Sequence, residues 1–193
     1  MSVNVSFHIK EKVIDPNDLI GGISICVDGN RVNAFEEGSG AFDLYEWRPQ
    51  YIGEHIFSDF SSLVETTTRL ASGEVMIYES IETCFDPLLS YWLFIPLSTD
   101  DLLIAYRTQT SYHGEQAPPL PTPESSRGYI ADRCDFCRAV SESAHEFVRE
   151  VESMPLEFGL DLLPCIKESL SNLDKTLETC EQTPTEFPSS QEE

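Results

Sequence analysis

Positive charge is scarce in this sequence. Its 193 residues include 12 Lys and Arg against 34 Asp and Glu, which gives a formal net charge of −22 at pH 7. A field of that sign repels the phosphate backbone of nucleic acids and anionic membrane surfaces, and it attracts basic proteins. The composition therefore argues against direct binding of nucleic acid or membrane and favours a basic protein as the partner.

Long apolar runs and targeting segments are also missing. The longest apolar stretch runs from Leu88 to Leu97, is interrupted by Ser90 and Pro96, and has half of the roughly 20 residues that a membrane-spanning helix needs. Residues 1–8 show no basic region followed by an apolar segment, which is the pattern of a secretory signal. We therefore expect a cytoplasmic protein whose six cysteines are reduced and mostly buried.

The sequence lacks the motifs of common active sites. It has no G-x-S-x-G, its four histidines fit no H-E-x-x-H spacing, and Gly21-Gly22 precedes a predicted strand where a phosphate-binding loop precedes a helix. We therefore predict no catalytic residues and no cofactor. One alternative is an enzyme or small-molecule-binding domain that uses thiols or carboxylates in a pocket between sheet and helices. A second alternative is an adaptor subunit of a larger assembly.

One pair of cysteines, Cys134 and Cys137, has the C-x-x-C spacing of zinc knuckles and redox-active dithiols. A structural zinc site needs two more ligands, but Cys165, Cys180 and His145 are scattered over predicted helices. A redox pair needs a thioredoxin-type βαβ context. We predict no metal site and interpret the pair as two helical cysteines, one facing inward and one partly exposed; metal binding or a redox role is the alternative.

The apolar content is that of a folded protein. Hydrophobic residues make up 40% of the chain and aromatic residues 10%, well above the level of disordered acidic chains. A chain of this length buries enough surface for one core. We therefore predict a single domain over residues 1–180 that includes a proline-rich loop at 113–128, followed by a disordered acidic tail at 181–193.

The first part of the chain is predicted to form strands. Residues 3–9 alternate between apolar and polar, as in a strand with one face in the core. The dipeptide Asp28-Gly29 separates two apolar segments, residues 23–27 and 32–35, and supplies the positive φ angles of a tight hairpin.

A helix and a second group of strands follow. Apolar residues at helical spacing from Ile52 to Leu70 predict a helix that stops near Gly73. Three segments rich in β-branched and aromatic residues then predict strands at 74–84, 88–97 and 102–110. The middle segment is apolar on both faces, which favours a central position.

The last part of the chain reads as two helices, with apolar stripes over residues 129–151 and 158–177. The expected fold class is therefore α+β. We expect a mostly antiparallel sheet of about six strands, with one helix inserted mid-chain and two C-terminal helices packed on the sheet.

Acidic residues beside aromatic ones are the best candidates for a binding surface, because aromatic side chains supply buried area and carboxylates accept bidentate bonds from arginine. A tryptophan that packs at a sheet edge and carboxylates that are solvated in loops remain the alternatives. The predicted partner-binding residues are Glu36, Glu37, Asp43, Tyr45, Glu46, Trp47, Asp100 and Asp101.

Three segments carry a resemblance to a known family: the hairpin Asp28-Gly29-Asn30, the strand Tyr91-Trp92-Leu93-Phe94 leading to Leu102-Leu103-Ile104-Ala105-Tyr106, and the helix with Phe136, Val140 and Phe147. In outline the chain resembles the small acidic α+β immunity proteins of bacterial polymorphic toxin systems over roughly residues 1 to 153. The resemblance implies an inhibitor that binds and neutralises a basic toxin. Such an inhibitor competes with nucleic acid for the toxin, and electrostatic steering raises its association rate about 10- to 1000-fold at low salt.

Overall fold

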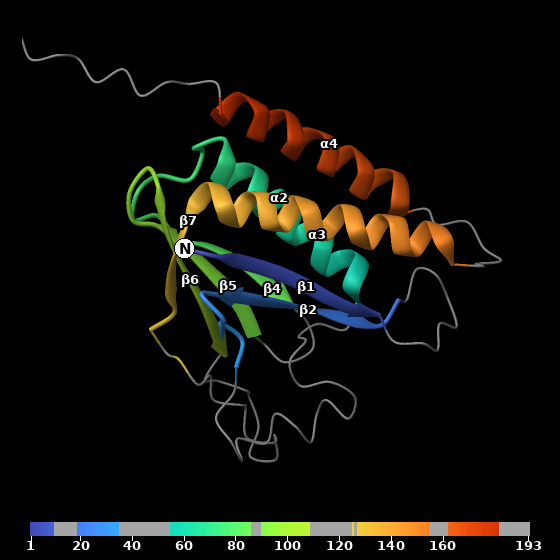
Figure 1. Ribbon diagram of the computed structural model, residues 1–193, viewed down its shortest axis with the longest axis horizontal. Coiled ribbons are helices and arrows are strands. Elements are labelled where there is room, and N and C mark those ends of the chain that lie inside the picture. The colour runs from blue at the N-terminus through green and yellow to red at the C-terminus, as the bar shows by residue number, and fades with distance from the viewer. Residues whose placement is uncertain are drawn as a thin grey trace, which may run out of the picture.

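The computed structural model of this chain is an α+β fold with two antiparallel sheets and three helices in its described part (Figure 1). Two sheets replace the single sheet of about six strands that the sequence predicts. The predicted tail beyond Glu181 and almost all of the predicted proline-rich loop lie outside the described residues. The structure describes residues 1–9, 19–34, 55–85, 90–108, 125, 127–154 and 162–181.

The first sheet contains β1 (Val3–Ile9), β2 (Gly21–Val27) and β3 (Asn30–Arg31) in that order. Strand β1 is the predicted alternating strand and pairs with β2 along its whole length. The predicted hairpin is confirmed, because Asp28 and Gly29 have φ angles of 49° and 79° and form a two-residue turn. The returning strand β3 occupies Asn30–Arg31, so the predicted position at 32–35 is wrong over its described residues, 32–34, which lie outside any strand.

The second sheet has the order β4-β5-β6-β7. Strand β5 lies between two neighbours, as its apolar sequence predicts. The first predicted strand, at 74–84, is wrong over its first half because residues 74–80 form a loop. The sheet gains β7 from residues that were predicted to begin a helix. Its strands are β4 (Ile81–Phe85), β5 (Ser90–Pro96), β6 (Asp101–Thr108) and β7 (Tyr129–Asp132).

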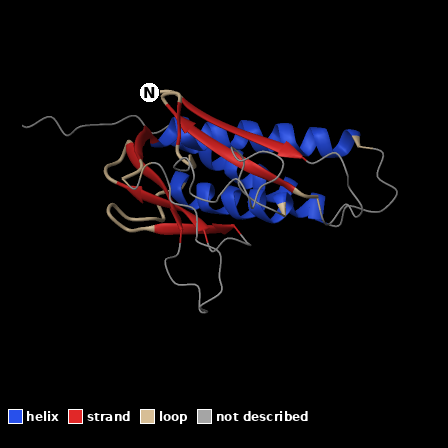
Figure 2. Ribbon diagram, turned by 90° about the horizontal axis from the view of Figure 1, so that it is seen from below, coloured by secondary structure: helices blue, strands red, loops and turns tan. Residues whose placement is uncertain are grey.

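Two of the helices, α2 (Ile56–Ala71) and α3 (Arg133–Ser153), join the two sheets. Helix α2 packs against β2 and β4, and α3 packs against β1 and β7, so each helix contacts both sheets. Figure 1 shows the helices together on one side of the strands, and Figure 2, seen from below, shows the strands in front of and beside the helices. No helix in these ranges combines the length and apolarity that crossing a membrane requires.

The last helix, α4 (Leu162–Glu181), packs on α2 and α3, on the side away from the strands (Figure 1). The prediction that both C-terminal helices lie on the sheet is therefore wrong for α4. Its apolar stripe contributes Ile166, Leu170 and Leu173, which are at most 1% exposed. Because α2 and α3 already cover the sheets, the stripe is buried against these helices instead.

Aromatic side chains connect the layers in the core. Phe147 of α3 stacks on Phe60 of α2 with ring centroids 4.7 Å apart, and it meets Phe7 of β1 edge to face at 5.6 Å. In the second sheet, Trp92 and Tyr106 are fully buried and lie 5.3 Å apart. One hydrophobic cluster therefore includes residues of both sheets and all three helices.

Candidate functional site

Two of the eight predicted partner-binding residues are described. Asp100 lies in the turn between β5 and β6, as predicted, and is exposed, whereas Asp101 is the first residue of β6 and is half-buried. The hydroxyl of Ser98 accepts bonds from the backbone N–H groups of Asp100 and Asp101, at 3.2 and 2.9 Å. The Ser98 hydroxyl therefore organises the backbone of the turn beside the exposed Asp100. The residues outside the described ranges are Glu36, Glu37, Asp43, Tyr45, Glu46 and Trp47.

A second surface feature lies next to this turn, in the loop of residues 72–80, which we name the α2–β4 loop. Near its start lies Gly73, whose φ is 73° and whose N–H donates to the Leu70 carbonyl. The N–H of Glu74 donates to the Arg69 carbonyl at 3.1 Å, which completes a Schellman motif. Gly73 therefore ends the helix as predicted, and the buried side chain of Val75 anchors the loop in the core.

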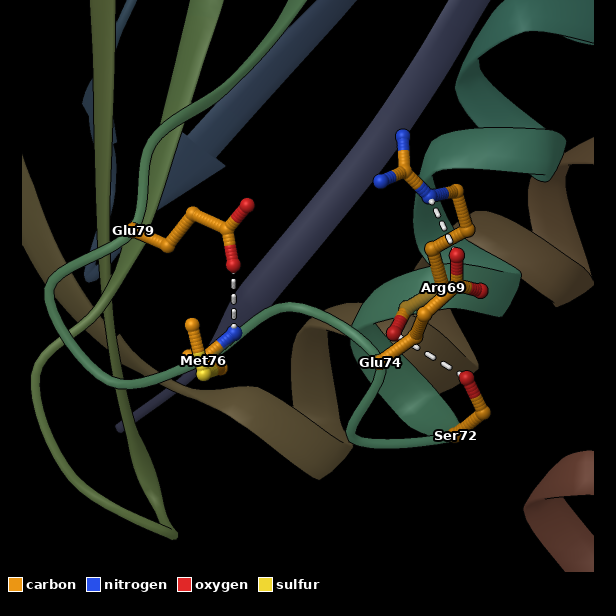
Figure 3. Close-up of polar contacts among 5 residues, drawn as sticks. All are labelled: Arg69, Ser72, Glu74, Met76 and Glu79. Carbon is orange, nitrogen blue, oxygen red and sulfur yellow. Dashed lines mark hydrogen bonds and ion pairs between the residues drawn. The ribbon is translucent and has the colours of Figure 1, made fainter.

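The tip of the α2–β4 loop is a tight turn held by two reciprocal bonds between Met76 and Glu79, and Figure 3 draws the one that involves the Glu79 carboxylate. The backbone N–H of Glu79 donates to the Met76 carbonyl, and the Met76 N–H donates to the Glu79 carboxylate, both at 3.0 Å. Tyr78 occupies the third turn position with a φ of 66°, where glycine is the usual residue. A bulky side chain in this conformation costs about 1–2 kcal/mol, and such strain gathers at functional sites.

The tip exposes three consecutive large apolar side chains. Met76 is 69% exposed, Ile77 53% and Tyr78 76%. Single exposed apolar residues are ordinary on protein surfaces, but a contiguous group on an ordered turn with acidic neighbours is typical of an interaction site. Tyrosine and methionine are also enriched in protein interfaces. The tip therefore has the chemistry of a binding surface.

The α2–β4 loop and the β5–β6 turn lie side by side at one end of the molecule (Figures 1 and 2). The N–H of Tyr78 donates to the carbonyl of Pro96, at the end of β5, at 2.8 Å. The N–H of Arg133, at the start of α3, donates to the carbonyl of Asp100. We name the surface formed by the α2–β4 loop and the β5–β6 turn the end surface. It is defined by Glu74, Met76, Ile77, Tyr78, Glu79 and Asp100.

A polar groove adjoins the end surface. It runs between α2 and α4 and has a volume of about 410 Å³. Glu74 belongs to both the groove and the α2–β4 loop, and its carboxylate lies 3.4 Å from Nε of Arg69 (Figure 3). The groove is lined by Glu65, Thr68, Arg69, Glu74, Ser169 and Asn172.

The cysteines of the C-x-x-C pair lie as predicted. Cys137 is 1% exposed and its thiol points toward the Thr67 carbonyl, 3.9 Å away, whereas Cys134 is half-buried. The prediction of mostly buried cysteines is wrong for the described side chains, because Cys165 lies on the solvent side of α4 and Cys26 is half-buried. Within the described ranges, no three His, Cys, Asp or Glu side chains are placed to hold a metal ion.

A cluster of Ser141, His145 and Asp174 joins α3 to α4 and was missed by sequence reasoning. Asp174 accepts a 2.7 Å bond from the Ser141 hydroxyl and lies 2.9 Å from Nε2 of His145. In hydrolytic triads the histidine lies between the carboxylate and the serine, where it can take the hydroxyl proton. Here the carboxylate lies between the other two, so the cluster links helices and does not activate a nucleophile.

Sequence reasoning also missed the exposed tip of the α2–β4 loop, because it assigned these residues to a strand. A signal against the strand was present: four consecutive apolar residues, Val75 to Tyr78, lie between Glu74 and Glu79 and break the alternation of a half-buried strand. No protein-family model, curated protein or solved structure matches this chain.

Proposed function

We propose that this protein is an acidic binding protein that recognises a basic protein partner through the end surface. The observation that carries the proposal is the exposure of Met76, Ile77 and Tyr78 on an ordered, strained turn between two glutamates. Residues held in this way are already arranged for binding, so little conformational entropy is lost when a partner covers them.

The apolar and acidic parts of the end surface have different roles in this proposal. Burial of each large apolar side chain contributes roughly 1.5–3 kcal/mol, which makes Tyr78 and its neighbours the source of affinity. Glu74, Glu79 and Asp100 attract a cationic partner, speed its approach and disfavour acidic competitors. A second copy of this chain would bring a net charge of −22 toward the same acids, so a basic partner fits better.

The most specific form of the proposal is an immunity-type inhibitor. A toxin that acts on nucleic acid has a basic active-site region, and an acidic protein with an apolar anchor can occupy it in place of the phosphate backbone. The charge of −22, the small α+β fold and the hydrogen-bonded turns of the end surface all support this function.

Affinity capture with the full chain tests the proposal. Wild-type protein, the double variant Ile77→Ser with Tyr78→Ser, and the control Leu162→Ser serve as baits for a lysate of the native host. Leu162 is 41% exposed and lies at the start of α4, away from the end surface. A basic protein recovered by the wild type is then purified, and its dissociation constant for each variant is measured over a salt series.

We expect wild type and the Leu162→Ser variant to bind one basic protein with an affinity that falls steeply as salt rises. The double variant should bind it at least a hundredfold more weakly, because roughly 3 kcal/mol of anchor burial is lost. Circular dichroism of all three baits controls for folding. Recovery of no basic protein at low salt, or equal binding by the double variant, would contradict the proposal.

A further inference from the structure

The residues that line the polar groove between α2 and α4 carry one more negative charge than positive charge. Among its lining residues Glu65 and Glu74 are acidic and Arg69 is basic, so two negative charges face one positive charge. Within the described ranges, Arg69 contacts Glu74 at 3.4 Å, and Glu65 forms no ion pair. Glu65 and Glu74 are both exposed, with the Glu74 side chain at 62%. The carboxylate of Glu65 is therefore available to a cation from outside.

We propose that this groove binds a single arginine side chain of the basic partner, an inference that rests on the proposed function. The volume of about 410 Å³ lies within the range of ligand pockets, and it is ample for a guanidinium group with its aliphatic stem. Because Glu74 lines the groove and also belongs to the end surface, a partner seated on Tyr78 can reach the groove with a neighbouring side chain.

Arginine is favoured over other cations by the arrangement of acceptors. A guanidinium group has five N–H donors in a planar fork and can bond several acceptors at once. The groove offers two carboxylates, the Asn172 amide oxygen and the hydroxyl oxygens of Thr68 and Ser169. The Thr68 hydroxyl donates its proton to the Val64 carbonyl at 2.8 Å, so its oxygen can still accept a hydrogen bond from another donor.

The contact between Arg69 and Glu74 shows that the groove already accommodates one guanidinium group against a carboxylate (Figure 3). A lysine ammonium carries three donors on a compact, strongly hydrated group and would satisfy fewer of these spread acceptors. Among the described residues, no three His, Cys, Asp or Glu side chains come together in the groove in an arrangement that would hold a metal ion.

Titration of the full chain with N-acetyl-arginine amide, followed by two-dimensional NMR of backbone amides, tests the inference. We expect saturable shifts in the millimolar range that are centred on Glu65, Thr68, Ser169 and Asn172. N-acetyl-citrulline amide has nearly the same shape without the charge and should cause no saturable shifts. N-acetyl-lysine amide should bind several-fold more weakly, and equal binding of lysine and arginine would overturn the assignment to arginine.

A matched pair of variants locates the site. The substitution Glu65→Gln should weaken binding of N-acetyl-arginine amide about tenfold, the usual loss for one charged hydrogen bond. The substitution Glu178→Gln removes an exposed carboxylate from α4 outside the groove and should leave binding unchanged. Equal losses in the two variants would mean that the probe senses only the net charge, and the inference would fall.

The outcomes separate this inference from the proposed function. If the probe causes no saturable shifts while the loop variant still loses the basic partner, the groove inference is wrong and the proposed function stands. If the probe binds in the groove but no basic protein is captured, the arginine selectivity of the groove is supported. The proposed function, and with it the origin of the arginine in a basic partner, would then be wrong.

Discussion

The backbone N–H of Tyr78 donates to the carbonyl oxygen of Pro96 at 2.8 Å, and this bond places the α2–β4 loop against the end of β5. The two residues are far apart in sequence, and neither one alone indicates a binding surface. Together they bring an exposed apolar turn next to Asp100 in the β5–β6 turn. Tyr78 thus combines a backbone bond to β5 with a positive φ and a side chain that is 76% exposed.

Strain at Tyr78 predicts an unusual order of stabilities for its variants. Tyr78→Gly should be more stable than Tyr78→Ala by about 1 kcal/mol, because glycine adopts a φ of 66° without the steric cost that alanine retains. Urea unfolding of the two variants measures the difference, and both have lost the aromatic side chain. An alanine variant as stable as the glycine variant would show that the turn carries no strain.

Two glycines should respond very differently to alanine. A Cβ on Gly128 would lie 2.5 Å from the Ile104 carbonyl oxygen and 2.7 Å from the Ala105 Cβ, whereas a Cβ on Gly73 meets open space. Both residues have positive φ, so the backbone cost of about 1 kcal/mol is shared. Gly128→Ala should lower the free energy of unfolding by roughly 2 kcal/mol or more beyond the loss in Gly73→Ala, because the new Cβ would meet atoms of β6. Thermal and urea unfolding of the two variants test this, and equal losses would contradict the packing of Gly128 against β6.

A buried pair of hydroxyls joins α2 to β4. The side-chain oxygens of Thr66 and Thr83 lie 2.7 Å apart, and both residues are at most 6% exposed. Thr66→Val or Thr83→Val alone should cost about 1–3 kcal/mol, because each leaves a buried hydroxyl without its partner. The double variant should lose less free energy of unfolding than the two single variants together. A double-mutant cycle from urea unfolding measures this coupling. Additive losses would show that the bond contributes nothing.

Thiol reactivity should follow exposure. Alkylation of the native protein with iodoacetamide, followed by peptide mapping, should modify Cys165 first and Cys134 more slowly, while Cys137 reacts only after unfolding. Cys134→Ser should leave Cys137 equally protected, since its burial against α2 does not depend on the neighbouring thiol. Rapid labelling of Cys137 in the native state would show that α3 opens away from α2.

Elements defined by local chemistry could be predicted from the sequence. Strand β1 follows from its alternating residues, the hairpin from the preference of Asp28-Gly29 for positive φ, and α2 from its apolar spacing and its glycine stop. The inner position of β5 follows from its apolar faces. Each of these features depends on residues that are neighbours in the chain.

Features that depend on distant residues could not be predicted in the same way. The apolar stripe predicts a helix that includes residues 129–132, but these residues pair with the start of β6. Helix α3 begins after them, and Asp132 caps it by accepting a 2.9 Å bond from the N–H of Asp135. Residues 76–78 are apolar, as in a strand. In the structure they form a turn that bonds to Pro96 through the Tyr78 N–H, and their side chains are exposed to solvent. For the candidate site, only the Asp100 turn was predicted, since the exposure of its apolar neighbours depends on this packing.

The sequence by itself determined the acidity of this protein, the alternation of its α and β segments and the turns at Asp28-Gly29 and Gly73, because composition and local backbone preferences decide these properties. Only the tertiary structure decided that the strands form two sheets joined by α2 and α3, that α4 packs on helices, and that Tyr78, Asp100 and the groove share one end. These features require pairings between distant segments, and such pairings are selected by the burial of the whole core.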